Sequence, residues 1–188
     1  MVPDSLRLCR IFLVSSAGPT SPEIRRALAA AGLFHAVPAP PTAQLPDHFT
    51  PRRVNMVVAP VDDAADRDAL AWVRRIRHHR DPNVALAPLV AVGRSIRPSG
   101  LALLVHHGFD DVVVLPADPQ TLVDRLTRTV VAPEPFYRTA DYFGPDRRRA
   151  FAVTAVEERR GTPAGPASRL TVARQPGSGC SIVDEVAV

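Results

Sequence analysis

Five short apolar runs, each followed by a stretch with helical or turn-forming character, constrain the fold of this 188-residue chain more than any other feature. The runs lie at residues 10–14, 34–37, 54–58, 89–92 and 112–114. Near-continuous apolar strands that alternate with helices are typical of a parallel sheet covered on both faces. The sequence therefore predicts an α/β fold, a doubly wound, flavodoxin-like sheet of five parallel strands in the order 2-1-3-4-5 with helices on both faces.

The segments between these runs carry the start and stop signals of helices. Gly32 and Gly108 end two apolar helical stripes, since glycine readily adopts the left-handed conformation of a helix end. Another helix is predicted from about residue 64 to 79, and Asp118–Pro119 begins the last one. Five prolines interrupt residues 38–51, so no regular helix is expected there.

Composition divides the chain into three parts. Residues 1–132 contain all the predicted strands and helices and form the expected domain. Residues 133–150 combine aromatic side chains with arginines; this extension either folds back on the domain, docks on a partner, or is a plain linker. Residues 151–188 are rich in Gly, Pro, Ser and Ala towards their middle, and we predict a disordered tail.

Charge and cysteine content exclude several classes of protein. The formal net charge of +4 falls short of the basic stripe of a dedicated nucleic-acid binder. Cys9 and Cys180 lie far apart, without the spacing of metal ligands or of a disulfide framework. No signal peptide and no apolar run of membrane length is found, so we expect a cytoplasmic protein without membrane insertion.

Several local strings resemble the CheY-like receiver domain of bacterial response regulators. Asp68-Ala-Leu-Ala-Trp-Val-Arg-Arg-Ile-Arg77 is similar to the third helix of that family. Gly108-Phe-Asp-Asp111 and Leu115-Pro-Ala-Asp-Pro119 resemble its approach to the fifth strand and the fifth helix. The resemblance covers about residues 8 to 131, and Phe143-Gly-Pro-Asp-Arg-Arg-Arg149 is similar to an extension that follows some receivers.

The resemblance implies positions for phosphorylation, but none keeps the residue type that the reaction requires. Receivers use an acidic pair that helps to bind Mg²⁺, a phosphoacceptor aspartate, a hydroxyl residue, a lysine and an aromatic ring. The matching positions here are, in that order, Ser15 and Ser16, Pro60 or Val61, Val92 or Gly93, Leu115, and Val112. Because Mg²⁺ requires oxygen ligands and no cluster of acids converges at the strand ends, we expect no metal, no cofactor, no acyl phosphate and no enzymatic activity.

Asp62 and Asp63 leave one alternative open. They follow the expected acceptor position by two or three residues, so either would serve as a displaced phosphoacceptor. The competing interpretation is a loop in which one of them caps the next helix.

The function that follows from the resemblance is that of a degenerate receiver, a phosphorylation-independent interaction module in two-component-type signalling. Its partners would be a histidine kinase or another response regulator, with a homodimer as an open alternative. The contact surface implied is the fourth helix, fifth strand and fifth helix, and the candidate contact residues are His106, His107, Gln120, Arg147, Arg148 and Arg149. A nucleic-acid-associated protein that uses its arginine-rich third helix and its tail is the other alternative.

Overall fold

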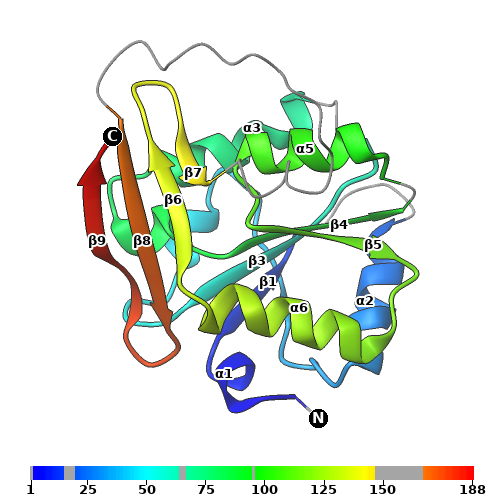
Figure 1. Cartoon of the computed structure of the whole chain (residues 1–188). Helices are drawn as coiled ribbons and strands as arrows, with labels where there is room; N and C mark the ends of the chain where they lie inside the picture. The colour runs from blue at the N-terminus through cyan, green and yellow to red at the C-terminus, as the bar shows by residue number, and fades with distance from the viewer. Residues whose placement is uncertain (1, 15–19, 64–66, 95, 147–166) are drawn as a thin grey trace.

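A computed structural model of the chain describes residues 2–14, 20–63, 67–94, 96–146 and 167–188 (Figure 1). The elements follow in the order α1 (Asp4–Arg7), β1 (Arg10–Leu13), α2 (Thr20–Ala30), β2 (Val37–Pro38), the 3₁₀ turn η1 (Leu45–His48), β3 (Asn55–Pro60), α3 (Arg67–Arg77), α4 (Pro82–Ala85), β4 (Leu89–Arg94), α5 (Pro98–His107), β5 (Asp111–Leu115), α6 (Pro119–Val131), β6 (Glu134–Arg138), β7 (Phe143–Pro145), β8 (Ser168–Gln175) and β9 (Gly179–Ala187). None of the described helices is both long enough and apolar enough to cross a bilayer.

The central sheet has five strands, all parallel, in the order β2-β1-β3-β4-β5. This arrangement confirms the predicted doubly wound, flavodoxin-like α/β fold. The apolar runs predicted three of the strands closely because β1, β3 and β4 are buried on both faces and need no polar alternation.

Side chains alternate between the two faces of this sheet, as the two-residue period of a strand requires. One face packs on α2 and α6 through Ile11, Met56, Val90 and Leu115. The other face packs on α3 and α5 and includes Phe12, Val57, Ala91 and Val112. Figure 1 shows the two helical layers above and below the strands.

The glycines and the aspartate that predict helix ends have the expected conformations and contacts in the described residues. Gly32 and Gly108 have φ angles of 77° and 113°, the left-handed region that glycine adopts without strain. The Asp118 carboxylate accepts a hydrogen bond from the Thr121 backbone N–H at 3.0 Å and caps α6. The third helix is described over Arg67–Arg77 and ends two residues before the predicted residue 79; the predicted residues 64–66 lie outside the described residues.

The second predicted strand is wrong in extent. Only Val37–Pro38 pair with β1, whereas Phe34 in the same apolar run is 80% exposed. An apolar run predicts a strand only when its side chains are buried, and here the run is part of the turn after α2. Two short helices, α1 and α4, were not predicted because four residues are too few to show a helical period.

Residues after 133 build a second sheet, antiparallel, in the order β7-β6-β8-β9. The prediction of a disordered tail is therefore wrong for residues 168–187; residues 147–166 lie outside the described residues. Residues 151–188 have the composition of a disordered segment, but within them apolar residues alternate with polar ones along β8. Leu170 and Val172 of β8 are fully buried against Phe136 of β6 and Leu86, which follows α4. Residues 134–146 thus fold back on the domain, which was one of the three alternatives for the extension.

Candidate functional site

The carboxyl ends of the five parallel strands meet at one edge of the central sheet, where proteins of this fold place their working site. At this edge β1 ends at Leu13, β3 at Pro60, β4 at Arg94 and β5 at Leu115. Ser15 and Ser16, the positions matched to the acidic pair, lie outside the described residues. The remaining matched positions are all described.

The end of β3 is closed by apolar packing. Val61 is 3% exposed, and its backbone N–H donates to the Val92 carbonyl at 2.9 Å. A Cβ atom added to Gly93 would clash with the Val61 carbonyl oxygen and lie 2.8 Å from the Ile96 side chain. The space beside β3 is therefore filled by backbone and by aliphatic carbon.

The end of β5 is also apolar. Leu115 is 7% exposed and packs in the core cluster of α2 and α6, together with Leu122. Val112, at the position matched to the aromatic ring, is 7% exposed and packs on the α3 and α5 side. Neither side chain offers a group that binds an anion.

The charged groups near this edge already have partners. Arg94 and Glu23 form an ion pair of 2.6 Å between β4 and α2. Asp62 and Asp63 are exposed in the loop after β3, and both take part in further interactions within the protein. Among the described residues no three His, Cys, Asp or Glu side chains converge as a metal site, and the groups present at this edge do not fit Mg²⁺.

The candidate partner residues do not form one patch. His106 and His107 end α5, whereas Gln120 begins α6, where its side chain donates to Asp124 at 2.7 Å. Because both helices run antiparallel to the strands, these sites lie at opposite edges of the sheet. The His106 ring lies 6.4 Å from the Tyr142 ring, so the chain's own extension reaches this end of α5.

Arg147, Arg148 and Arg149 lie outside the described residues. His107 and His106 both take part in interactions within the protein.

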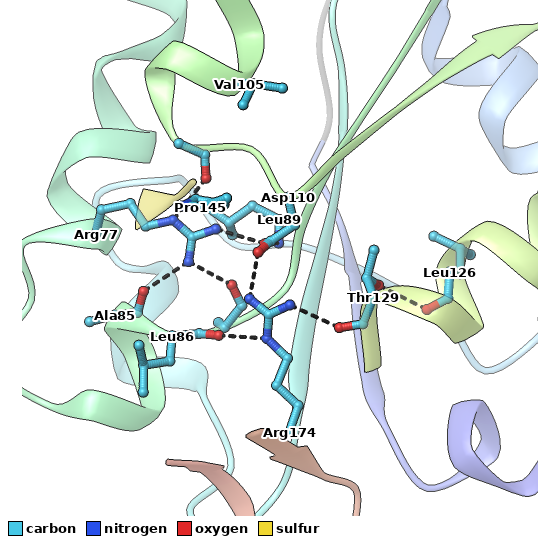
Figure 2. A network of polar contacts seen from close by, with 12 residues as sticks. Arg77, Ala85, Leu86, Leu89, Val105, Asp110, Leu126, Thr129, Pro145 and Arg174 are labelled. Atoms are coloured by element: carbon cyan, nitrogen blue, oxygen red, sulfur yellow. Dashed lines mark hydrogen bonds and ion pairs between the residues drawn. The ribbon is translucent and has the colours of Figure 1, made fainter. Parts of the chain in front are cut away.

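A buried polar network lies at the opposite, amino-terminal edge of the sheet, and the sequence did not predict it. It joins Arg77 of α3, Asp110 just before β5, and Arg174 of β8 (Figure 2). Arg77 donates to Asp110 Oδ2 at 2.7 Å, and Arg174 donates to Asp110 Oδ1 at 2.6 Å. All three side chains are at most 1% exposed.

The two guanidinium groups also satisfy backbone carbonyls of the last residue of α4 and of the loop that follows it. Arg77 donates to Ala85 and Ala87 at 2.8 and 2.9 Å, and Arg174 donates to Leu86 at 2.9 Å. Three successive buried carbonyl groups are therefore paired, which removes the cost of burying them unsatisfied. A buried irregular loop is stable here because arginine supplies several donors in a fixed planar arrangement.

Arg174 in addition caps α6. The Thr129 carbonyl would normally accept from the N–H four residues later, but residue 133 is proline and has no N–H. Arg174 Nη1 donates to that carbonyl at 2.8 Å. The second sheet is thereby bonded to the end of α6, to the α4–β4 loop and to β5.

Phe136 completes the network. Its ring is fully buried, with the Arg77 guanidinium carbon 5.2 Å and the Arg174 guanidinium carbon 5.6 Å from its centre. Both distances are those of cation–π contacts. Burial lowers the pKa of Arg77, and the charge of Asp110 opposes that effect; arginine nevertheless stays protonated in proteins.

The buried network therefore holds two cations and one carboxylate. Asp110 is the one carboxylate that contacts either guanidinium in the part of the chain that the structure describes. A signal for Arg77 existed in the sequence, since Leu70, Val73 and Arg77 have the spacing of one helix face.

Comparison with known proteins finds likeness only at the level of structure. No family model matches the chain, and no curated protein matches it. Solved structures with similar folds include a response regulator from Thermotoga maritima, with 18% identity and a TM-score of 0.46, covering 64% of this chain and 97% of that one. The CheY-like protein TadZ from Pseudomonas aeruginosa has 16% identity and a TM-score of 0.49, covering 64% and 98%.

A third structure, the receiver domain of a histidine kinase from Syntrophus aciditrophicus, covers 82% of this chain and 98% of its own, with 12% identity and a TM-score of 0.45. Identities and TM-scores of this size carry no argument about activity, so the fold assignment depends on strand order and register. The chain thus has the doubly wound, flavodoxin-like α/β fold, extended by a packed antiparallel sheet, and its structural neighbours are receiver domains.

Proposed function

We propose that this chain is a degenerate receiver, a non-enzymatic and phosphorylation-independent interaction module in cytoplasmic two-component-type signalling. The observation that carries the proposal is the apolar closure of the strand ends. Leu115 and Val61 are core residues at positions where phosphoryl transfer would require a cation and a carboxylate. Stabilising a phosphoryl group depends on positioned charges, and carbon side chains supply none.

The interaction surface in this proposal is formed by α5, β5 and α6. Helix α5 has the sequence Pro-Ser-Gly-Leu-Ala-Leu-Leu-Val-His-His, and only Leu104 of it is buried. Leu103 and Val105 are partly exposed, and Val114 of β5 is 40% exposed. A helix that is apolar on most sides favours burial against another surface, and a histidine kinase or another response regulator is the proposed partner.

The phosphorylation test uses the intact chain with acetyl phosphate and Mg²⁺, read by intact-mass spectrometry. We expect no phosphate-sized increase in mass, under conditions in which an active receiver is labelled. An adduct would contradict the proposal. Its loss in Asp62→Asn or Asp63→Asn would then establish the second candidate, a displaced phosphoacceptor, which the exposure of both aspartates at the carboxyl edge favours.

The partner test compares affinity capture from the native cell by the intact chain and by Leu103→Glu. Ala71→Glu, an exposed position on α3, is the matched control because it adds the same charge on another face. We expect Leu103→Glu to lose a partner that Ala71→Glu retains. Equal capture by both variants would remove the α5 surface from the proposal, and salt-sensitive binding of DNA would favour the nucleic-acid alternative.

A further inference from the structure

A groove of about 330 Å³ lies between the end of α3, the short helix α4 and the second sheet. Its polar lining comes from His78, His79, Arg80 and Arg138, and its apolar lining includes Phe143 and Ile182. This volume is within the usual range for small-molecule sites, which are apolar with a few convergent polar groups. The groove is at the amino-terminal edge of the central sheet, away from the carboxyl ends of the parallel strands.

The groove has an excess of positive charge. No carboxylate is among its described lining residues. Arg138 pairs with Glu185 at 2.9 Å and lies over the Phe143 ring at 5.2 Å. Within the described part of the chain, by contrast, no hydrogen bond or ion pair engages the side chain of Arg80, which is exposed.

The buried network of Arg77, Asp110 and Arg174 adds to the positive charge near the groove. Arg77 lines the groove, and it shares the carboxylate of Asp110 with Arg174, so the three groups carry one net positive charge. Figure 2 shows both guanidinium groups directed at the same carboxylate. A charge in a low-dielectric interior is screened weakly, so this net positive charge favours an anion at the adjacent surface.

We propose that this groove binds a small organic anion, a carboxylate, sulfonate or phosphate ester carried on a flat apolar or aromatic body. The anionic group lies between Arg80 and Arg138, where arginine supplies paired donors to its oxygens. The apolar body packs on Phe143 and Ile182, which are contributed by the second sheet. This site does not depend on the interaction function proposed above.

The test uses anilinonaphthalene sulfonate, an aromatic sulfonate that fluoresces when it leaves water, and the intact chain. We expect saturable binding of one molecule per chain, with amide shifts in the NMR spectrum centred on Phe143 and Ile182. The double variant Arg80→Gln/Arg138→Gln should bind about tenfold more weakly, as expected for the loss of two partly exposed charge contacts. Arg80→Lys, which keeps the charge but loses the paired planar donors, should bind more weakly than the intact chain and more tightly than the double variant.

The matched control is Arg26→Gln/Arg75→Gln, which removes the same charge from exposed positions on α2 and α3 outside the groove. Equal weakening in control and test variants would mean general attraction to a basic protein and would overturn the proposal. Binding by a glutamate-rich, leucine-containing peptide but not by the sulfonate would also overturn it, in favour of a protein partner. Far-UV circular dichroism and thermal melting establish that each variant is folded.

Discussion

Asp110→Asn should be among the most destabilising conservative substitutions in the described part of this chain. The carboxylate accepts three hydrogen bonds, from Arg77 at 2.7 Å, from Arg174 at 2.6 Å and from the Leu89 backbone N–H at 2.6 Å. Asparagine keeps one acceptor oxygen, and its amide N–H₂ replaces the other. If the oxygen stays with Arg77 and Leu89, the amide donors face the donors of Arg174.

The cost follows from burial. Both guanidinium groups are at most 1% exposed, so water cannot replace the lost carboxylate. Removing one partner of a buried ion pair costs about 3–5 kcal/mol. For a chain of this length such a loss lowers the thermal midpoint by about 10 °C. Urea denaturation followed by circular dichroism measures the free energy of unfolding directly.

The neighbouring aspartate provides a matched control. Asp111 pairs with Arg125 at 2.5 Å and with Arg128 at 3.7 Å, but these arginine side chains are 40% and 69% exposed. The Asp111 carboxylate is 9% exposed, but solvent reaches the arginine side of both pairs. Asp111→Asn should therefore cost less than Asp110→Asn. Equal costs for the two substitutions would refute the argument that the Asp110 network is buried and tightly coupled.

A double variant tests the assignment of Arg174. In Asp110→Asn/Arg174→Met the guanidinium that faces the new amide is gone, so the double variant should lose less stability than the sum of the two single ones. The expected coupling is about 1–3 kcal/mol, the range for residues in one hydrogen-bond network. Simple additivity would mean that Arg174 and Asp110 do not act together.

Three further outcomes are expected. Gly93→Ala should lower the free energy of unfolding by about 1–3 kcal/mol in urea denaturation, because its Cβ would clash with the Val61 carbonyl oxygen; a neutral result would mean that this sheet edge is open. Asp118→Ala should cost about 1 kcal/mol in the same assay through loss of the α6 cap. Burial raises the pKa of Cys9 to about 12 and the pKa of Cys180 to about 11. Both thiols should therefore react slowly with iodoacetamide at pH 8 until the protein unfolds. Their contribution to stability should fall as the pH rises above about 9, where the thiols of the unfolded chain ionise.

The sequence was sufficient for the central sheet because its signal is local. Continuous apolar runs mark strands buried on both faces, and Gly32 and Gly108 mark helix ends that need a left-handed residue. The apolar character of Val61 and Leu115 at strand ends was also visible in the sequence, and their burial is now described. Asp62 and Asp63 are exposed residues of the loop after β3, as the loop interpretation predicts.

The second sheet was not predicted because its strands are stabilised by contacts with residues far away along the chain. Leu170, Val172 and Arg174 lie on the same, buried face of β8. A turn rich in Gly and Ser then leads to Gly179, which has a φ of 92°. The prediction of disorder was based on the Gly and Ser content of this turn and not on the alternation of apolar residues in β8. Nothing local in the sequence indicates the contacts of Arg174, because its partners lie 45 to 88 residues away along the chain.

These long-range contacts change how the extension should be treated in any search for a partner. A chain that ends at residue 132 would lack Arg174 and Phe136, so the Leu86 and Thr129 carbonyls would lose their donors and Leu86 would be uncovered. Newly exposed apolar surface of this kind captures proteins nonspecifically. Loss or gain of a partner on truncation would therefore report damage to the domain as readily as removal of a binding site. Because the second sheet is part of the domain's packed and hydrogen-bonded interior, its role in binding is separated from its role in folding only by substitutions at exposed positions of that sheet, such as Arg138 of β6.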